Sequence, residues 1–473
     1  LASYFSDVTL NDLTITGGDA GSSPTARGSD PDGGGIYAIE VNLEVNGSEI
    51  SGNSGDIGGG LFFYSEYGSL AVNDSMVSGN NAGFGGGAYA IGADGDITFS
   101  GSQISSNTAD SAYGGFTAFS ERGDIGLIDS VVSGNSVVGG SEFTPTGRFA
   151  DVKAALAERR ADSHWSNRGI SRRGPVGGAI LLSYFGSIEI NQATISGNSA
   201  GEFGGAFAVA GTGSLVVDSS TISGNSADSF GGGAVLNAKY DLQVRNSTIS
   251  GNSSGNLNGG LALYSDLSGG EQILSTARGE ERPRNILIEF TTITANSAVD
   301  IGGLGISSDI TVPVTASVIS GNTAPTDPDI GFEPGSSAQA DLEFSLVGVD
   351  STSGTLNFDA ASLSLRGQDP LLGPLADNGG PTFTHLPGDG SPLIGVIPPG
   401  TAGCGGTVAD DQSGQDRPVD GGCDIGSVER GTPTPPPPAV AVPVMDRIGL
   451  LLMAGLLGLA GLFGFRRRSE LKR

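Results

Sequence analysis

The sequence predicts an all-β fold: a parallel β-helix (solenoid) of about nine or more coils, followed by one C-terminal transmembrane helix. Three observations carry this prediction: a polar phrase recurs about every 27 residues, apolar residues keep a fixed phase to it, and an apolar run lies near the chain end. The 473 residues include 81 Gly but only 9 Tyr and 1 Trp. This composition favours β-rich repeats with a core of small and aliphatic side chains over a mixed globule.

The phrase Ile-Ser-Gly-Asn and its variants mark each repeat. Successive Asn residues lie 26 to 28 positions apart, except at two steps of 63 and 44 residues. The surplus at these steps falls in two insertions, 141–175 and 266–285, where the composition changes. The Asn residues are Asn53, Asn80, Asn107, Asn135, Asn198, Asn225, Asn252, Asn296 and Asn322. We expect their amides to stack as a structural ladder at a coil corner rather than to bind a ligand.

The apolar residues of each unit fall on strand positions. An Ile or Val stands three residues before each Asn, and pairs such as Ile188 and Ile190 stand ten and eight residues before it. Spacing of two is that of a strand with one face inward. Gly pairs such as Gly204-Gly205 open another short strand, so each unit reads strand, turn, strand, turn. One unit cannot bury its apolar face, but nine stacked rungs make a continuous core roughly 43 Å long.

Units such as Ile195-Ser-Gly-Asn-Ser-Ala, followed by Gly204-Gly205-Ala206, are similar to polymorphic outer-membrane protein repeats. The array from 1 to 347 resembles the right-handed parallel β-helices of the pectin-lyase-like superfamily. That resemblance implies a right-handed coil. It does not fix an activity, because the fold carries lyases, hydrolases and non-catalytic adhesins alike.

The charge balance narrows the possible partners. The formal net charge is −28, and the basic residues gather in the two insertions and at the C-terminus. The acidic body is a poor partner for nucleic acid. Ca²⁺ is the one cofactor that the sequence suggests, because the turn acids Asp56, Asp110 and Asp228 offer oxygen ligands. We favour the alternative that these acids are solvated turn residues.

One column of polar residues offers a candidate catalytic site. Seven residues before the Asn, successive rungs carry Asn191, Asp218, Arg245 and Glu289, which we expect to point outward and stack. Two carboxylates flanking an Arg could serve polysaccharide cleavage. An exposed ion-pair ladder is the alternative that we favour, since aromatic residues able to hold a sugar are scarce. The exception is the group Phe63, Tyr64 and Tyr67.

Other residues add no catalytic arrangement. His164 lies in the first insertion and His385 lies beyond the repeats, so neither completes a triad on the coils. Residues Phe149 to Ala161 of the first insertion have the pattern of a short amphipathic helix. This segment is either a partner-facing element or a tolerated insertion.

Region 348–431 resembles the choice-of-anchor Q domain. The resemblance rests on the segment starting at Asp369, on Asp411-Gln-Ser-Gly-Gln-Asp-Arg-Pro, and on Cys423-Asp-Ile-Gly-Ser-Val-Glu429. It implies a surface protein whose anchoring is left to the segment that follows. Cys404 and Cys423 are close enough in sequence to form one local disulfide in an oxidising compartment.

The last residues have the pattern of a sorting signal. A Pro-rich linker, 432–441, leads to a segment, 442–473, that holds Pro443, an apolar run at 448–465 and a basic tail. The basic cluster is Arg466, Arg467 and Arg468. The apolar run is long enough to span a bilayer, with the basic cluster in the cytoplasm. The segment resembles IPTL and PEP C-terminal signals, which implies cutting by an exosortase-like enzyme. A plain membrane anchor is the alternative.

Together these features predict an exported surface protein of a Gram-negative bacterium. The chain opens inside a strand, so we expect its export signal to lie on a missing N-terminal segment. The favoured function is a non-enzymatic rigid rod for adhesion or for contact with polysaccharide, matrix or host surfaces. The alternative is a polysaccharide lyase or glycoside hydrolase that uses Asp218, Arg245 and Glu289.

Overall fold

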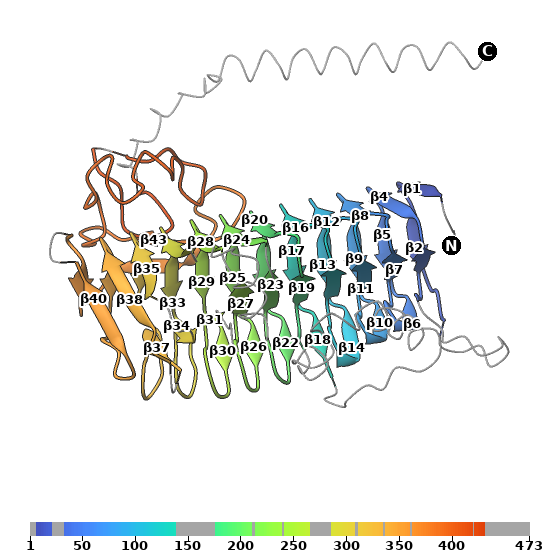
Figure 1. Ribbon diagram of the computed structural model, residues 1–473, viewed down its shortest axis with the longest axis horizontal. Coiled ribbons are helices and arrows are strands. Elements are labelled where there is room, and N and C mark those ends of the chain that lie inside the picture. Colours follow the sequence, from blue (N-terminus) through green and yellow to red (C-terminus); the bar gives the residue numbers. More distant parts are fainter. Residues whose placement is uncertain are drawn as a thin grey trace, which may run out of the picture. The chain divides into compact units, whose positions relative to one another are not determined.

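The computed structural model shows an all-β fold made of stacked parallel strands (Figure 1). The described residues are 6–20, 33–138, 176–210, 213–238, 241–264, 285–307, 311–333, 336–359, 362–419 and 421–430. The chain divides into two compact units, 1–430 and 431–473, and all described residues belong to the first. The expected all-β repeat fold is confirmed, and the stacking is consistent with a parallel β-helix.

Each coil contributes strands to up to four sheets, which we number in the order in which the chain visits them. Sheet 1 has 12 strands: β1 (Asp7–Asn11), β4 (Asn42–Asn46), β8 (Leu70–Asn73), β12 (Ile97–Ser100), β16 (Ile125–Ile128), β20 (Ile188–Asn191), β24 (Ser214–Asp218), β28 (Asp241–Arg245), β32 (Asn285–Glu289), β35 (Thr311–Thr315), β38 (Gln339–Glu343) and β40 (Thr355–Phe358). Sheet 2 also has 12: β2 (Thr14–Thr16), β5 (Glu49–Ser51), β9 (Met76–Ser78), β13 (Gln103–Ser105), β17 (Val131–Ser133), β21 (Thr194–Ser196), β25 (Thr221–Ser223), β29 (Thr248–Ser250), β33 (Thr292–Thr294), β36 (Val318–Ile319), β39 (Leu346–Val347) and β41 (Leu365–Arg366).

The other two sheets are shorter. Sheet 3 has seven strands: β6 (Ser54–Ile57), β10 (Asn81–Phe84), β14 (Thr108–Ala112), β18 (Ser136–Val137), β22 (Ser199–Ala200), β26 (Ser226–Ala227) and β30 (Ser253–Ser254). Sheet 4 has ten: β3 (Ile36–Ile39), β7 (Leu61–Ser65), β11 (Ala88–Gly92), β15 (Phe116–Ser120), β19 (Ala179–Ser183), β23 (Ala206–Ala210), β27 (Ala234–Ala238), β31 (Leu261–Tyr264), β34 (Leu304–Ser307) and β37 (Ile330–Phe332). The short strands of sheet 3, directly after the Asn, were not expected from the sequence.

The apolar core follows from the register. Leu215 of β24 pairs with Ile188 of the preceding rung and with Leu242 of the next, so like stacks on like. The inward residues of sheets 1, 2 and 4 form one continuous buried cluster. Outward residues alternate with them, as a strand of period two requires.

The stack crosses its first insertion without a break. Phe116 of β15 pairs directly with Ala179 of β19, so the coil resumes in register after residues 139–175, which lie outside the described residues. Twelve rungs in sheets 1 and 2 span about 53 Å at roughly 4.8 Å per step. Strands β40 and β41 still pair in parallel with the rung before them, up to Phe358 and Arg366.

The Asn residues form a buried ladder along the corner between sheets 2 and 3. The backbone N and the side-chain Nδ2 of Asn198 both donate to Oδ1 of Asn225, at 3.0 and 2.9 Å. Asn225 Nδ2 in turn donates to the carbonyl oxygen of Ile195 at 2.9 Å. The same pattern repeats from Asn53 to Asn296, so each amide bonds the next rung.

A carboxylate ends this ladder. Asn322 donates its backbone N and its Nδ2 to Oδ1 of Asp329, at 3.1 and 2.9 Å, and Val349 N donates to Oδ2 at 2.7 Å. Because a carboxylate only accepts hydrogen bonds, Asp329 satisfies the last amide without needing another rung. Burial raises the pKa of Asp329, while the bonds from Asn322 lower it.

The second Gly of each pair is needed because the ladder leaves no room for a Cβ. A Cβ on Gly205 would lie 1.9 Å from the carbonyl oxygen of Gly233 and 3.0 Å from Asn225 Nδ2. Other pairs show the same approach to the amide of their ladder neighbour, for example Gly87 to Asn107. The Gly column and the Asn column therefore depend on each other.

After the repeats, residues 369–430 form a lobe, which we call the C-terminal lobe. It contains one antiparallel pair, β42 (Leu372–Ala376) and β43 (Thr384–Pro387), and otherwise consists of turns. Its apolar residues, including Leu393 and Ile425, share a buried cluster with Phe290 and Phe344 of the coils. The lobe is therefore packed against the outer surface of the later rungs.

No helix in the described part of the chain is long and apolar enough to cross a membrane. The expected transmembrane segment 448–465, Pro443 and the basic cluster lie outside the described residues, as do the second insertion through Arg284 and the expected helix at 149–161.

Candidate functional site

The structure brings the predicted column together on consecutive rungs of sheet 1. Asp218 pairs with Arg245 in register, and Arg245 pairs with Glu289. Arg245 Nε donates to Asp218 Oδ2 at 2.7 Å, and these side chains are 37% and 17% exposed. Asp218 and Arg245 thus form a partly exposed ion pair, as in the ladder interpretation.

Glu289 has a different environment from Asp218. It is 8% exposed, because the backbone of the lobe lies against it: a Cβ on Gly403 would lie 2.4 Å from Glu289 Oε1. Burial raises the pKa of Glu289, while the charges of Arg245 and Arg417 lower it. The expectation that all three side chains face solvent is therefore wrong for Glu289, which the lobe covers.

The C-terminal lobe covers the outer face of sheet 2 through hydroxyl groups. Gln412 Nε2 donates to Thr221 Oγ1 at 2.9 Å, and Thr248 Oγ1 donates to Gln412 Oε1 at 2.6 Å. Ser427 N donates to Thr292 Oγ1 at 3.1 Å. Thr221, Thr248 and Thr292 occupy one outward position on successive rungs, and all are buried. They form a docking track for the lobe.

His385 adds a contact between the lobe and sheet 2. Its Nε2 lies 2.7 Å from Ser250 Oγ, and its Nδ1 lies 2.7 Å from the carbonyl oxygen of Gly373. Since a carbonyl only accepts, Nδ1 carries the proton and Nε2 accepts from Ser250. Burial lowers the pKa of His385, and the bond to Gly373 opposes this.

Sequence analysis missed the docking surface, although two signals mark it. The outward position of sheet 2 varies over the first five rungs, where it is Thr14, Glu49, Met76, Gln103 and Val131, and is then Thr in every rung from Thr194 to Thr292. The corner after sheet 1 has positive φ in each rung and is polar or Gly up to Asn246. It then becomes Phe290, Ala316 and Phe344. Bulky apolar residues at positive φ are unfavourable unless something buries them, so this change indicates a covering element.

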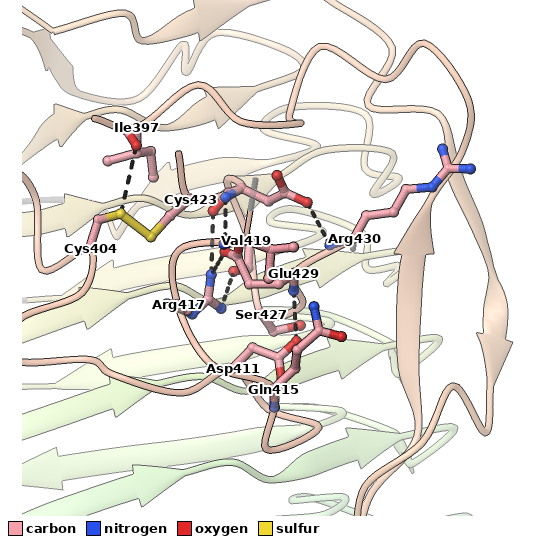
Figure 2. A network of polar contacts seen from close by, with 12 residues as sticks. Ile397, Cys404, Asp411, Gln415, Arg417, Val419, Cys423, Ser427, Glu429 and Arg430 are labelled. Carbon is pink, nitrogen blue, oxygen red and sulfur yellow. Dashed lines mark hydrogen bonds and ion pairs between the residues drawn. A yellow bond between two sulfur atoms is a disulfide. The ribbon is translucent and has the colours of Figure 1, made fainter. Parts of the chain in front are cut away.

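A buried ionic network holds the lobe together (Figure 2). Arg417 is fully buried, pairs with Glu429, and donates through Nη2 to the carbonyl oxygen of Gly426 at 3.0 Å. Its guanidinium also lies 4.0 Å from the ring centroid of Phe290 on the coils. Asp411 Oδ2 accepts from Glu429 N at 2.7 Å. Asp411 and Arg417 of the first motif therefore bond Glu429 of the second inside the lobe.

The network is paired but strongly desolvated. Burial raises the pKa of Glu429 to about 7, against the lowering effect of Arg417. Burial likewise lowers the pKa of Arg417, and Glu429 opposes this change. Removing one partner of a buried ion pair of this kind lowers the free energy of unfolding by several kcal/mol, because the other charge is left unpaired.

Cys404 and Cys423 form a disulfide inside the lobe, with an S–S distance of 2.03 Å (Figure 2). Both residues are fully buried in the cluster that the lobe shares with the coils. The bridge joins Cys423, at the start of the second motif, to Cys404, and so encloses the first motif in a covalent loop.

Neither the turn acids nor the aromatic group converges on a site. Asp56 on β6 and Asp110 on β14 are two rungs apart, roughly 9.6 Å, which is too far for them to share one Ca²⁺. Within the described residues, no group of three or more His, Cys, Asp or Glu could hold a metal ion. Phe63 lies in the core, whereas Tyr67 is exposed.

A scan against protein-family models and a search of curated proteins both found no match to this chain. The resemblances to β-helix, anchor-domain and sorting-signal families therefore rest on the motifs themselves.

Proposed function

We propose that this protein is an exported surface protein of a Gram-negative bacterium: a non-enzymatic, rigid, right-handed β-helix rod for adhesion or for contact with polysaccharide or matrix. The observation that carries the proposal is that both carboxylates of the outward column are already occupied. Asp218 is neutralised by Arg245, and the C-terminal lobe covers Glu289. The remaining twelve-rung stack is a scaffold on which turns and insertions can be displayed.

Two further features support export and anchoring. The buried disulfide fits folding in an oxidising compartment. The motifs at 348–431 and 442–473 suit an anchor-Q-like region and a tail that is inserted in the membrane and cut by an exosortase-like enzyme. Pro443→Ala should then leave the tail uncut, as measured by the mass of the protein recovered from cells, whereas a plain anchor would give the same mass for both chains.

Polysaccharide cleavage is the alternative, and one observation favours it: a carboxyl with a raised pKa, such as Glu289, suits a general acid. The test uses the full chain in a sugar-free detergent, with acidic and neutral polysaccharides, with and without Ca²⁺. New reducing ends and unsaturated products are measured.

We expect no products from the wild type. Cleavage that Asp218→Asn abolishes would overturn the non-enzymatic proposal. Asp350→Asn is the matched control, because Asp350 also pairs with an Arg, Arg366, and lies outside the column.

A further inference from the structure

One edge of the solenoid carries a row of exposed turns. These turns connect sheet 4 to sheet 1 and contain Tyr67, Asp94, Arg122 and Phe185 on four successive rungs. We call these four residues the turn ridge. Their backbones are held in register, since Asp94 N donates to Glu66 O at 3.0 Å, Arg122 N to Ala93 O at 2.7 Å, and Phe185 N to Glu121 O at 2.8 Å.

The two ends of the turn ridge are exposed aromatic rings. Tyr67 is 72% exposed and Phe185 is 48% exposed. Phe185 is supported from one side by Tyr184, whose ring centroid lies 4.4 Å away in an edge-to-face arrangement. Exposing large rings to water is unfavourable unless a partner covers them. Three rung steps, roughly 14 Å, separate the two rings.

Polar groups that suit sugar hydroxyls lie between the rings. Arg122 Nη1 pairs with Asp94 Oδ1 at 2.5 Å, and Arg122 Nη2 lies 3.4 Å from Glu121 Oε1. The pair is part-exposed, so it presents both donors and acceptors at the surface. A hydroxyl both donates and accepts, and it can bond either member of such a pair.

The charge of the ridge selects the kind of glycan. In these four turns Arg122 is the only basic residue, whereas Glu66, Asp94 and Glu121 are acidic. The ridge is therefore net negative and repels a polyuronate, whose charges recur along the chain. A neutral glycan avoids this repulsion, and an extended one can follow the turns from rung to rung.

We propose that the turn ridge binds an extended, neutral polysaccharide, with Tyr67 and Phe185 stacking on sugar rings and the Asp94–Arg122 pair bonding hydroxyls between them. This inference rests on the proposed surface function and names its ligand class. It places binding on an edge separate from the column Asp218, Arg245 and Glu289.

The test measures retention of the full chain, in a polyoxyethylene detergent that contains no sugar, on glucomannan, cellulose and polygalacturonate. We expect retention on the neutral glycans. Tyr67→Ala combined with Phe185→Ala should weaken it about tenfold or more, whereas Tyr67→Trp should keep it. The matched control is Phe383→Ala, which removes a ring of similar exposure from the C-terminal lobe. Thermal unfolding checks that all variants are folded.

Unchanged retention of the double variant would overturn the ridge as the binding site. Stronger retention on polygalacturonate than on neutral glycans would overturn the ligand class. Retention on none of the three would overturn the whole inference, yet it would leave the proposed surface location standing. That location is tested separately, by whether protease added outside intact cells cuts the protein.

Discussion

At the scale of single residues, stability comes from polar columns as much as from apolar ones. The amide ladder is one such column, and the corner hydroxyls are another. Ser48 N donates to Ser75 Oγ of the next rung at 3.0 Å, and Ser75 N donates to Ser102 Oγ at 3.1 Å. In both columns the backbone N of one rung finds its acceptor in the side chain of the next. Polar groups can therefore be buried at the corners without being left unsatisfied.

Removing one amide should destabilise the protein strongly. Asn225→Ala removes the acceptor shared by Asn198 N and Asn198 Nδ2 and one donor to the carbonyl of Ile195, so we expect a loss of about 3 kcal/mol or more in the free energy of unfolding. Denaturant unfolding measures this loss. Asn191→Ala, at a half-exposed position on sheet 1, is the control and should stay within about 0.5 kcal/mol. Equal losses would contradict the ladder's role.

The stability of the lobe should depend on pH through His385. Its pKa is lowered in the folded state, so the unfolded chain binds the proton more tightly. The stabilising contribution is therefore present above about pH 6.5 and is lost as the pH falls below that value, by at most about 1.4 kcal/mol per pH unit. The raised pKa of Glu429 acts in the opposite direction, since its contribution is lost as the pH rises toward about 7.

Comparison with His385→Asn separates these two effects, because Glu429 is common to both chains. The stability advantage of the wild type over the variant should shrink between pH 7.5 and pH 5.5, as measured by urea unfolding. An advantage that is constant or grows toward acid pH would show that the pKa of His385 is not lowered.

At the scale of elements, the Gly pair between each sheet 3 strand and the following sheet 4 strand packs closely against the ladder. This packing limits which residues these positions can hold. A Cβ on Gly87 would lie 2.5 Å from Gly115 O and 2.9 Å from Asn107 Nδ2. Gly79 in the same coil has a φ of 61° but nothing within 4 Å of a Cβ. The two glycines are therefore required for different reasons, space at Gly87 and backbone conformation at Gly79.

Alanine at these two positions should give unequal losses. We expect Gly87→Ala to cost about 3 kcal/mol, because backbone atoms must move, and Gly79→Ala to cost about 1 kcal/mol, from the positive φ alone. Thermal or denaturant unfolding of both variants provides the comparison. A larger loss at Gly79 would contradict the crowding seen at the Gly pair.

At the scale of the whole folded unit, the C-terminal lobe ties several rungs together from the side. Its contacts run from Thr221 to Thr292 and on to Ala316, which accepts a bond from Gly426 N at 2.8 Å. Contacts in a bare solenoid join only neighbouring rungs. Because the lobe joins rungs that are not adjacent, it should make their unfolding more cooperative.

A pair of Thr substitutions on one column tests this docking. Thr248→Val leaves Gln412 Oε1 and Ser427 Oγ short of a partner, so we expect a loss of about 1–3 kcal/mol and earlier hydrogen exchange in the lobe. Thr194→Val, which lies two rungs earlier on the same column and is half-buried, should change stability by less than about 0.5 kcal/mol. Equal effects at both positions would argue against docking through the Thr track.

The sequence by itself determined the repeat, the strands that carry its apolar positions and the identity of the ladder residues. A period near 27 residues and strict apolar phase are local properties, and stacking identical units turns them directly into sheets. The Asn and Gly columns were visible for the same reason, since each recurs at one position of every unit. The ending of the ladder at Asp329 was not visible, because that residue comes from a different part of the coil.

Only the tertiary structure decided where the C-terminal lobe lies, and hence which polar residues are accessible. Glu289 belongs to the same column as Asp218 and was expected to face solvent, but the lobe buries it. The motif residues Arg417 and Glu429 could have been surface features, yet they pair inside the lobe. The physical reason is that docking joins segments up to 192 residues apart, as between Ser220 and Gln412, through single hydrogen bonds that no sequence period records.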